Sequence, residues 1–205
     1  MSAKARRRVQ SQLPRESRLS GVFLVGFMGA GKTSVGRALA QYLNWAFEDL
    51  DERIERLECR TVPEIFRDSG EAAFRRAEHA AMRDVLAELE GGAVRVVAVG
   101  GGAFVQENNA ALLKTAGVPT VFLDAPVEEL WQRCSKQAGE AGAERPLLSS
   151  IKQFRELYVA RRKHYLQASQ TIQTGGRALE EIAAEITEAL GLKRIEIRTQ
   201  QGEVE

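Results

Sequence analysis

The sequence predicts an α/β fold, a doubly wound parallel sheet with helices on both faces. Strand-like apolar runs alternate with segments of helical periodicity along the chain. This alternation is typical of parallel strands joined by right-handed crossovers. The run Val94–Val99 is almost continuously apolar, as expected of a strand buried on both faces. With 205 residues, the chain is long enough for one domain with a substantial core.

Five short segments are predicted as strands, most of them apolar runs bounded by polar or turn-forming residues. In chain order they are Val22–Val25, Ala46–Glu48, Val94–Val99, Val118–Leu123 and Gln170–Gln173.

The longest predicted helix, Glu71–Leu89, carries apolar residues at helical spacing, so one of its faces should pack on the sheet. Breaks are expected near Pro63 and at Ser69-Gly70. The segment Ser135–Ser149 has no apolar periodicity and is predicted as a mobile loop. The remaining predicted helices are a stretch after Asp51, Ser34–Leu43, Glu107–Thr115, Val127–Cys134, Ile151–Ala168 and Leu179–Leu190.

Composition and charge indicate a cytoplasmic protein. The net charge of +1 gives no reason to expect a nucleic-acid or membrane partner, and no apolar run is long enough to span a bilayer. Cys59 and Cys134 match no zinc or redox spacing and are expected to be reduced thiols. We expect residues 1–19 to be a disordered basic tail, with a transit peptide as the alternative. Residues 193–205 are expected to be a polar tail, leaving 20–192 as the domain.

The most specific motif is G-x-x-x-x-G-K-T, which spans Gly26–Thr33 between an apolar strand and a helix. Its glycines let successive backbone N–H groups point at an anion, and the following helix adds its positive dipole end. Lys32 would reach the β- and γ-phosphates, and the Thr33 hydroxyl would ligate Mg²⁺. The alternative is a glycine-rich turn that carries a lysine by chance. The flanking strand and helix favour a nucleoside triphosphate site instead.

Two more polar clusters follow predicted strands, at the edge where ligands of parallel sheets bind. Asp49 and Asp51 would point the same way if the chain stays extended there. One could then serve Mg²⁺ through water while the other accepts a proton from an attacking hydroxyl. The alternative makes either one the N-cap of the next helix. Gly100–Gly102 is either a strand-ending turn or a place where a substrate approaches the backbone closely.

Arginines complete the candidate site. Arg75 lies on the long helix and could clamp a carboxylate, although Arg and Glu at this spacing are more often a solvated pair. Arg145 lies in the predicted loop, from which it could reach a transferring phosphate. His79 and His164 have no partner at metal-ligand spacing and are expected to serve surface or helix packing.

With these motifs in this order, the sequence resembles the shikimate kinase family. The segments that carry the resemblance are GFMGAGKTSVGRALA, DLD, GEAAFRRAE, VVAVGGGA, RPLL and ARRKHYLQAS, from about Val22 to Leu190. The resemblance implies an α/β/α sandwich of the P-loop nucleoside-monophosphate-kinase type, with a five-stranded parallel sheet and a mobile lid at about residues 135–149. It also implies ATP-dependent phosphorylation of the 3-hydroxyl of shikimate, with Mg²⁺, by a protein we expect to be a monomer.

The resemblance also implies roles for individual residues. Asp51 binds the substrate hydroxyl, Asp49 serves the metal through water, and Arg75 and Arg161 clamp the substrate carboxylate. Arg162 is adjacent to Arg161 and remains an alternative for the second clamp. Lys32 and the lid residue Arg145 stabilise the transferred phosphoryl group. The ATP-binding residues are then Gly29, Ala30, Gly31, Lys32, Thr33, Ser34, Arg133, Arg145 and Arg177, and Gly100, Gly101 and Gly102 join the substrate-binding set.

Two other functions fit parts of the sequence. One is a gluconate-type or other small-molecule kinase on the same fold, and the other is a non-catalytic nucleotide-binding regulator. Arg75, Gly100–Gly102 and Arg161 together suit a small carboxylated polyol rather than a nucleobase. The presence of Lys32 and Asp51 disfavours an inert regulator.

Overall fold

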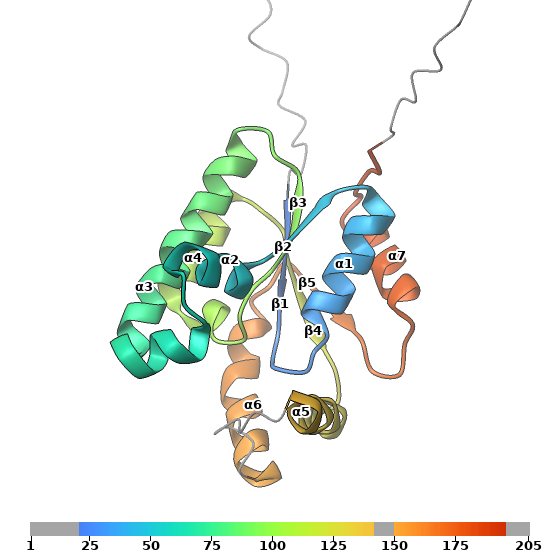
Figure 1. Ribbon diagram of the computed structural model, residues 1–205. Coiled ribbons are helices and arrows are strands. Elements are labelled where there is room, and N and C mark those ends of the chain that lie inside the picture. The colour runs from blue at the N-terminus through green and yellow to red at the C-terminus, as the bar shows by residue number, and fades with distance from the viewer. Residues whose placement is uncertain (1–20, 142–149, 196–205) are drawn as a thin grey trace, which may run out of the picture.

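Five parallel strands form the sheet at the centre of the protein, in the order β2-β3-β1-β4-β5 (Figure 1). The computed structural model describes residues 21–141 and 150–195. The strands are β1 (Gly21–Val25), β2 (Ala46–Asp49), β3 (Arg95–Ala98), β4 (Thr120–Asp124) and β5 (Gln170–Gln173). Each lies within two residues of its predicted position, so the predicted five-stranded parallel sheet is confirmed.

The helices form layers on the two faces of the sheet. They are α1 (Lys32–Leu43), α2 (Leu50–Glu58), α3 (Val62–Glu90), the 3₁₀ turn η1 (Ala103–Val105), α4 (Glu107–Ala116), α5 (Val127–Ala141), α6 (Ile151–Tyr165) and α7 (Leu179–Ala189). Figure 1 shows α1 and α7 packed together on one face, and α2, α3 and α4 on the other. The sheet is therefore sandwiched between helices.

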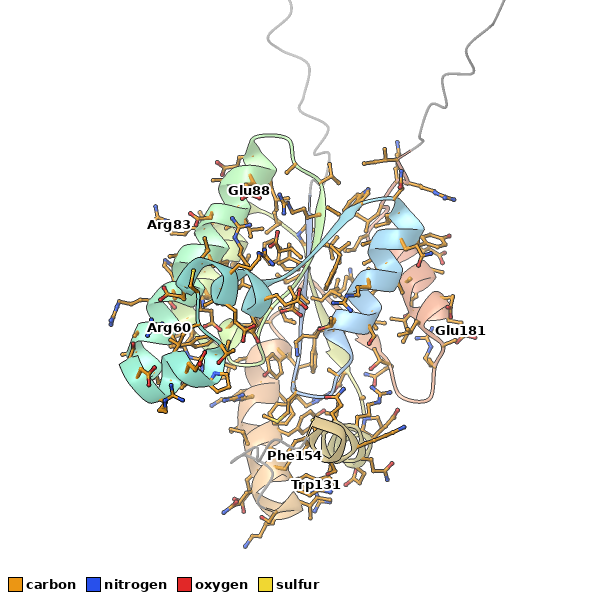
Figure 2. All side chains as sticks on the ribbon, in the orientation of Figure 1. Arg60, Arg83, Glu88, Trp131, Phe154 and Glu181 are labelled. Carbon is orange, nitrogen blue, oxygen red and sulfur yellow. The ribbon has the colours of Figure 1, made fainter. Side chains whose placement is uncertain are left out.

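The core is centred on β1, in which all five residues are buried. Hydrogen-bonded neighbours on both sides and helices on both faces remove this strand from water, as the apolar run predicts. The same core extends to the phosphate loop, α5 and α6. The Phe154 ring packs edge-to-face on Phe27 and on Trp131, with centroids 5.0 and 5.2 Å away. Figure 2 shows Trp131 and Phe154 where these two helices meet.

Two expectations about the helices are confirmed and two are wrong. The break expected near Pro63 separates α2 from α3, which starts with the capping box of Thr61 and Glu64. The break expected at Ser69-Gly70 is a kink inside α3, where Gly70 has φ 78°. However, α5 continues to Ala141 instead of ending at Cys134. The expected loop therefore begins as helix, because Lys136, Gln137 and Glu140 are good helix formers that extend an existing helix despite lacking an apolar stripe. The helix α6 stops at Tyr165, three residues before the predicted end at Ala168.

No helix in the described ranges combines the length and apolarity needed to cross a bilayer.

Candidate active site

The phosphate loop connects β1 to α1 and depends on glycine at defined positions. Gly29 has φ +77°, and a Cβ atom there would lie 2.8 Å from the carbonyl oxygen of Leu130. Both the backbone angle and the close approach of α5 exclude a side chain. Gly31, in the left-handed region, precedes α1 without any side-chain cap. The first N–H groups of α1 are therefore open to an anion.

Lys32 lies inside this loop. Its Nζ atom donates to the carbonyl oxygens of Gly26 and Phe27, both at 3.0 Å. Burial lowers the pKa of Lys32, and the nearby carboxylates of Asp51 and Asp49 oppose that shift. The ammonium group is thus held over the loop by weak carbonyl partners that a phosphate oxygen could replace.

Asp49 joins the phosphate loop to the end of β2. The Thr33 hydroxyl donates to Oδ2 of Asp49 at 2.8 Å, and Oδ1 accepts from the backbone N–H of Asp51 at 3.1 Å. Asp49 is therefore the N-cap of α2, and the chain does not stay extended to Asp51. The expectation that Asp49 and Asp51 share a strand face is wrong, because the N-cap turns the backbone into the first helical turn. The capping alternative holds for Asp49, which also contacts the candidate metal ligand Thr33.

Asp51 lies in the first turn of α2 and faces the glycine loop after β3. A Cβ atom at Gly100 would lie 2.8 Å from Oδ1 of Asp51, and this oxygen is buried without a hydrogen-bond partner in the described structure. Burial is the main cause that raises the pKa of Asp51 to about 6, Asp49 adds to it, and Lys32 opposes it. An unpartnered carboxylate oxygen with a raised pKa is suited to accept a proton from a bound hydroxyl.

The position of α2, and so of Asp51, is held by an ion-pair network around Glu48. This residue of β2 is 7% exposed. It accepts from Arg56 at 2.6 Å and from Arg53 at 3.4 Å, and it pairs with Arg95 of β3. Arg53 also pairs with Glu88 of α3 at 2.6 Å. The network joins α2 to β2, β3 and α3, so it restricts movement of the helix that carries Asp51.

Arg75 projects from α3 toward the same glycine loop. A Cβ atom at Gly102 would lie 2.6 Å from its Nη2. The guanidinium donates to Glu71 at 3.1 Å and to both oxygens of Glu78 at 3.0 Å. The alternative of a helix pair with Glu78 is therefore correct as to the pair but wrong as to its solvation, because Glu78 is 0% exposed, and Arg75 also faces the site.

The sequence predicts Glu78 only as the solvated acid of a helix pair, and its place in the site was missed. Its side chain is 0% exposed. Burial raises the pKa of Glu78 to about 7, and Arg75 opposes that shift. The spacing Arg75-x-x-Glu78 was a visible signal for an (i, i+3) pair. Burial of the acid could not be read from it.

The structure separates the two adjacent arginines of α6. The Arg162 guanidinium pairs with Asp124 at 2.7 Å, and the Tyr158 hydroxyl donates to the same carboxylate at 2.7 Å. Arg161 instead lies over the Phe27 ring of the phosphate loop, 5.9 Å from its centroid. Of the two, Arg161 faces the candidate site. The hydroxyl of Tyr165, one helical turn on, donates to the carbonyl oxygen of Gly101.

The remaining predicted nucleotide contacts have different positions. Arg133 donates to the carbonyl oxygen of Gly29 at 3.3 Å and pairs with Glu129, so it lies against the phosphate loop. Arg177 donates to the carbonyl oxygen of Gln173 at 3.0 Å and pairs with Glu185 of α7. Arg145 lies outside the described residues, and so does most of the predicted lid.

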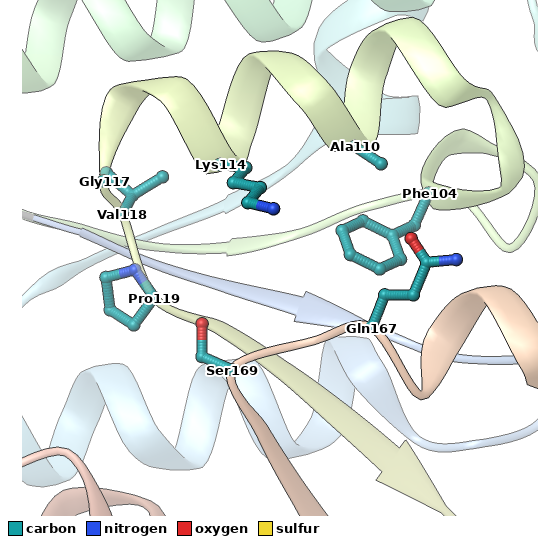
Figure 3. Close-up of a pocket in the computed structure, with 8 residues that line it drawn as sticks. All are labelled: Phe104, Ala110, Lys114, Gly117, Val118, Pro119, Gln167 and Ser169. Atoms are coloured by element: carbon teal, nitrogen blue, oxygen red, sulfur yellow. The ribbon is translucent and has the colours of Figure 1, made fainter.

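A cavity of about 510 Å³ lies outside the candidate site (Figure 3). It lies between α4 and the connection from α6 to β5. None of the predicted site residues lines it. The lining residues are Phe104, Ala110, Lys114, Gly117, Val118, Pro119, Gln167 and Ser169.

Comparison with known proteins agrees with this arrangement. A family model described as shikimate kinase matches residues 28–191. Shikimate kinases of Streptomyces coelicolor and Cereibacter sphaeroides are 43% and 41% identical over 175 residues, which is 84% of this chain and 96% and 83% of theirs. The chain belongs to the shikimate kinase family. A solved shikimate kinase from Acinetobacter baumannii, in complex with shikimate, matches with a TM-score of 0.74 and 36% identity, covering 84% of this chain and 93% of that chain.

Membership in the shikimate kinase family confirms the resemblance seen in the ordered motifs, and the fold of the relatives agrees with the predicted P-loop kinase architecture. The chain is thus an enzyme of the kinase class with ATP as co-substrate.

Proposed function

We propose that the protein transfers the γ-phosphoryl group of ATP to the 3-hydroxyl of shikimate, giving shikimate 3-phosphate on the route to chorismate and the aromatic amino acids. The observation that carries the proposal is the buried, unpartnered Oδ1 of Asp51. Both the donor-side cation Lys32 and the acceptor-side cation Arg75 act on this carboxylate. A base placed between a phosphate loop and a carboxylate clamp suits a hydroxylated acid as acceptor.

On the donor side, the backbone of Gly29–Ser34 would hold the phosphates of ATP. Lys32 would exchange its carbonyl partners, Gly26 and Phe27, for the β- and γ-phosphate oxygens. We propose Arg133 and Arg177 as contacts of the adenine end. Arg145 would complete the charge stabilisation from a lid that closes over the site and excludes water.

On the acceptor side, Asp51 would orient the 3-hydroxyl and take its proton as the phosphoryl group arrives. Arg75 and Arg161 would bind the carboxylate at the far end of the ring, and Gly100–Gly102 would let the ring approach the backbone. Holding both reactants in line supplies most of the acceleration in phosphoryl transfer.

Thr33 and Asp49 are the residues that would hold Mg²⁺, with Asp49 acting through water. The hydroxyl and carboxylate oxygens, already 2.8 Å apart, are the hard donors that Mg²⁺ prefers beside substrate phosphates. When bound, the ion would offset negative charge on the phosphates.

The raised pKa of Asp51 predicts the pH profile. Because the base must be deprotonated, kcat/KM for shikimate should rise as the pH passes upward through about 6 and then level off. In the Asp51→Asn variant, residual activity should lack this rise. A profile that falls across this range would contradict a basic role for Asp51.

The assay that tests the function uses the purified full-length protein with Mg-ATP and follows ADP release and ³¹P spectra of the product. Shikimate, quinate, gluconate and nucleoside monophosphates are compared as acceptors. We expect turnover with shikimate. Turnover only with gluconate or a nucleotide would identify a different small-molecule kinase, and ATP binding without any turnover would indicate a regulator.

The carboxylate clamp is tested by Arg75→Ala. Apparent shikimate affinity should fall about tenfold or more, because a charge-assisted hydrogen bond is lost, while the KM for ATP should not change. Arg67→Ala is the matched control on the same helix, since the exposed Asp68 is the one ion-pair partner of its guanidinium among the described residues. Unchanged shikimate affinity in Arg75→Ala would reject the clamp.

We also propose that the enzyme acts in the cytoplasm as a monomer, with no nucleic-acid or membrane partner. The nearly balanced charge of +1 supports the absence of a nucleic-acid or membrane partner. Size-exclusion chromatography with light scattering should give the molar mass of one chain for the full-length protein.

A further inference from the structure

A second pocket borders the acceptor side of the site, in the groove between α3 and the start of α4. Its volume is about 250 Å³. Arg75 is one of its walls and is also the proposed carboxylate clamp. The lining residues are Arg75, Arg76, His79, Ala80, Arg83 and Asn108.

Two arginines in this pocket lack an anionic partner. Arg76 and Arg83 are exposed and make no hydrogen bond or ion pair with any described residue. They are seven residues, or two helical turns, apart, so they project from the same side of α3. Figure 2 shows Arg83 on the outer side of this helix. The neighbouring carboxylates of Glu71 and Glu78 both bond to Arg75 and not to Arg76 or Arg83.

The floor of the pocket is fixed by a hydrogen-bond chain. Nδ2 of the buried Asn109 donates to the carbonyl oxygen of Ala103 at 3.1 Å, so its Oδ1 must face Nδ1 of His79, 2.7 Å away. An amide oxygen only accepts, so Nδ1 of His79 carries the proton. The chain joins the pocket to η1, directly after the glycine loop of the acceptor site.

We propose that this pocket is a second anion site, which binds a phosphate group. Planar guanidinium groups on two turns of one helix, with Arg75 beside them and the Asn108 amide opposite, can surround a tetrahedral oxyanion. The group would be supplied by inorganic phosphate or by a small phosphomonoester. Because Arg75 is shared, an occupied pocket draws this guanidinium away from the acceptor carboxylate. This second consequence rests on the proposed function, whereas binding itself does not.

Binding is tested on the full-length protein with Mg²⁺ and a saturating non-hydrolysable ATP analogue, so that the phosphate loop is occupied. Inorganic phosphate is titrated at constant ionic strength by calorimetry and by the shift in Tm, and glycerol phosphate is titrated in parallel to distinguish a free ion from a phosphomonoester. The double variant Arg76→Gln/Arg83→Gln should bind phosphate about tenfold or more weakly, since it loses charge-assisted bonds. Lys193→Gln/Arg194→Gln removes two positive charges beyond α7 and should bind like the parent protein.

Equal phosphate affinity in the parent and the Arg76→Gln/Arg83→Gln variant would overturn the proposal, because the anion would then occupy only the acceptor clamp. The circular dichroism and Tm of the unliganded variant serve to verify folding. In the kinetic arm, phosphate should raise the KM for shikimate in the parent with no change in kcat, and less so in the double variant. Competition with ATP instead of shikimate would also contradict the site. Failure of shikimate turnover would reject the proposed function while the binding comparison still decides the anion site.

Discussion

The donor and acceptor halves of the candidate site are built in different ways. The phosphate-binding part of the donor half is one continuous segment, Gly26–Ser34, in which backbone angles and the start of α1 create the anion site. The acceptor half is assembled from side chains of α2, α3, α6 and the glycine loop after β3. Its two key acids, Asp51 and Glu78, have raised pKa values because of burial. Local geometry thus shapes one half, and buried charge shapes the other.

This contrast predicts how each half fails. A change of backbone geometry should damage ATP binding, because the loop relies on N–H direction. Removal of one charge should weaken shikimate binding or change the pH dependence of activity. The reason is that the buried charges of the acceptor half balance one another, so the loss of one leaves its partner uncompensated. Substitutions in one half should therefore leave the binding constant of the other half unchanged.

Asp51→Asn should lower kcat about 10²–10⁴-fold, the usual contribution of a positioned general base. The affinity for a non-hydrolysable ATP analogue should stay within about twofold, because the Asp51 carboxylate faces the acceptor-side Gly100 and would not bind the phosphates. Steady-state kinetics and calorimetry measure the two effects. Asp68→Asn, an exposed acid on α3, is the control and should leave both unchanged. A parallel loss of ATP affinity would place Asp51 in the metal or donor site and remove the distinction between the halves.

Glu78→Gln should change the pH dependence of stability. Its pKa is about 7 in the folded protein and 4.5 for the ordinary side chain, so the folded state binds more protons between these values. The free energy of unfolding therefore falls as the pH rises through this window. Glu78 alone contributes on the order of 3 kcal/mol to this fall. Denaturant unfolding from about pH 5 to about pH 8 should show a flatter profile in Glu78→Gln.

The exposed partner of Arg75 supplies the matched control for that experiment. Glu71→Gln removes the other carboxylate on the same guanidinium and should keep most of the parent profile, because burial is the main cause of the raised pKa of Glu78 and Glu71 is a minor one. Part of the fall should survive in Glu78→Gln, because Asp51 shifts in the same direction. An unchanged profile in Glu78→Gln would mean that this acid does not carry the pH dependence.

Much of this site could be predicted from sequence because its parts lie at strand ends. The phosphate loop, Asp49, Asp51 and Gly100–Gly102 meet as expected, since β2, β3 and β1 are neighbours in the sheet. Local signals were less reliable where tertiary context decides. The N-cap at Asp49 changed the direction of Asp51, and the length of α5 followed helix propensity rather than an apolar pattern.

Pairing choices were beyond the reach of sequence patterns. Arg161 and Arg162 are adjacent, and the partner that distinguishes them, Asp124, lies 38 residues away from Arg162 in the chain. The importance of Glu78 depends on complete burial, which follows from how α3 packs. Long-range contacts decide such features, and no local spacing encodes them.

Two glycine substitutions compare the halves directly. Gly102→Ala places a methyl group against the guanidinium of Arg75. It should raise the KM for shikimate about tenfold with little change for ATP, since it weakens one charge-assisted contact. Gly29→Ala, at φ +77°, should instead raise the KM for ATP, because the loop cannot keep its backbone angle. If each variant altered both constants equally, the two halves would not be independent.

Tyr165→Phe should have the smallest effect and probes how firmly the acceptor half is held. The hydroxyl of this buried residue donates to the carbonyl oxygen of Gly101, between the two glycines that contact Asp51 and Arg75. Its loss should cost about 1 kcal/mol of unfolding free energy, the usual value of one hydrogen bond. Because the phenylalanine ring still fills the core against Phe122, the glycine loop should become more mobile while the packing of the core is kept. The KM for shikimate should rise about two- to fivefold, in proportion to that free energy, and the KM for ATP should stay constant. A changed ATP constant with unchanged shikimate affinity would show that the glycine loop supports the donor half instead.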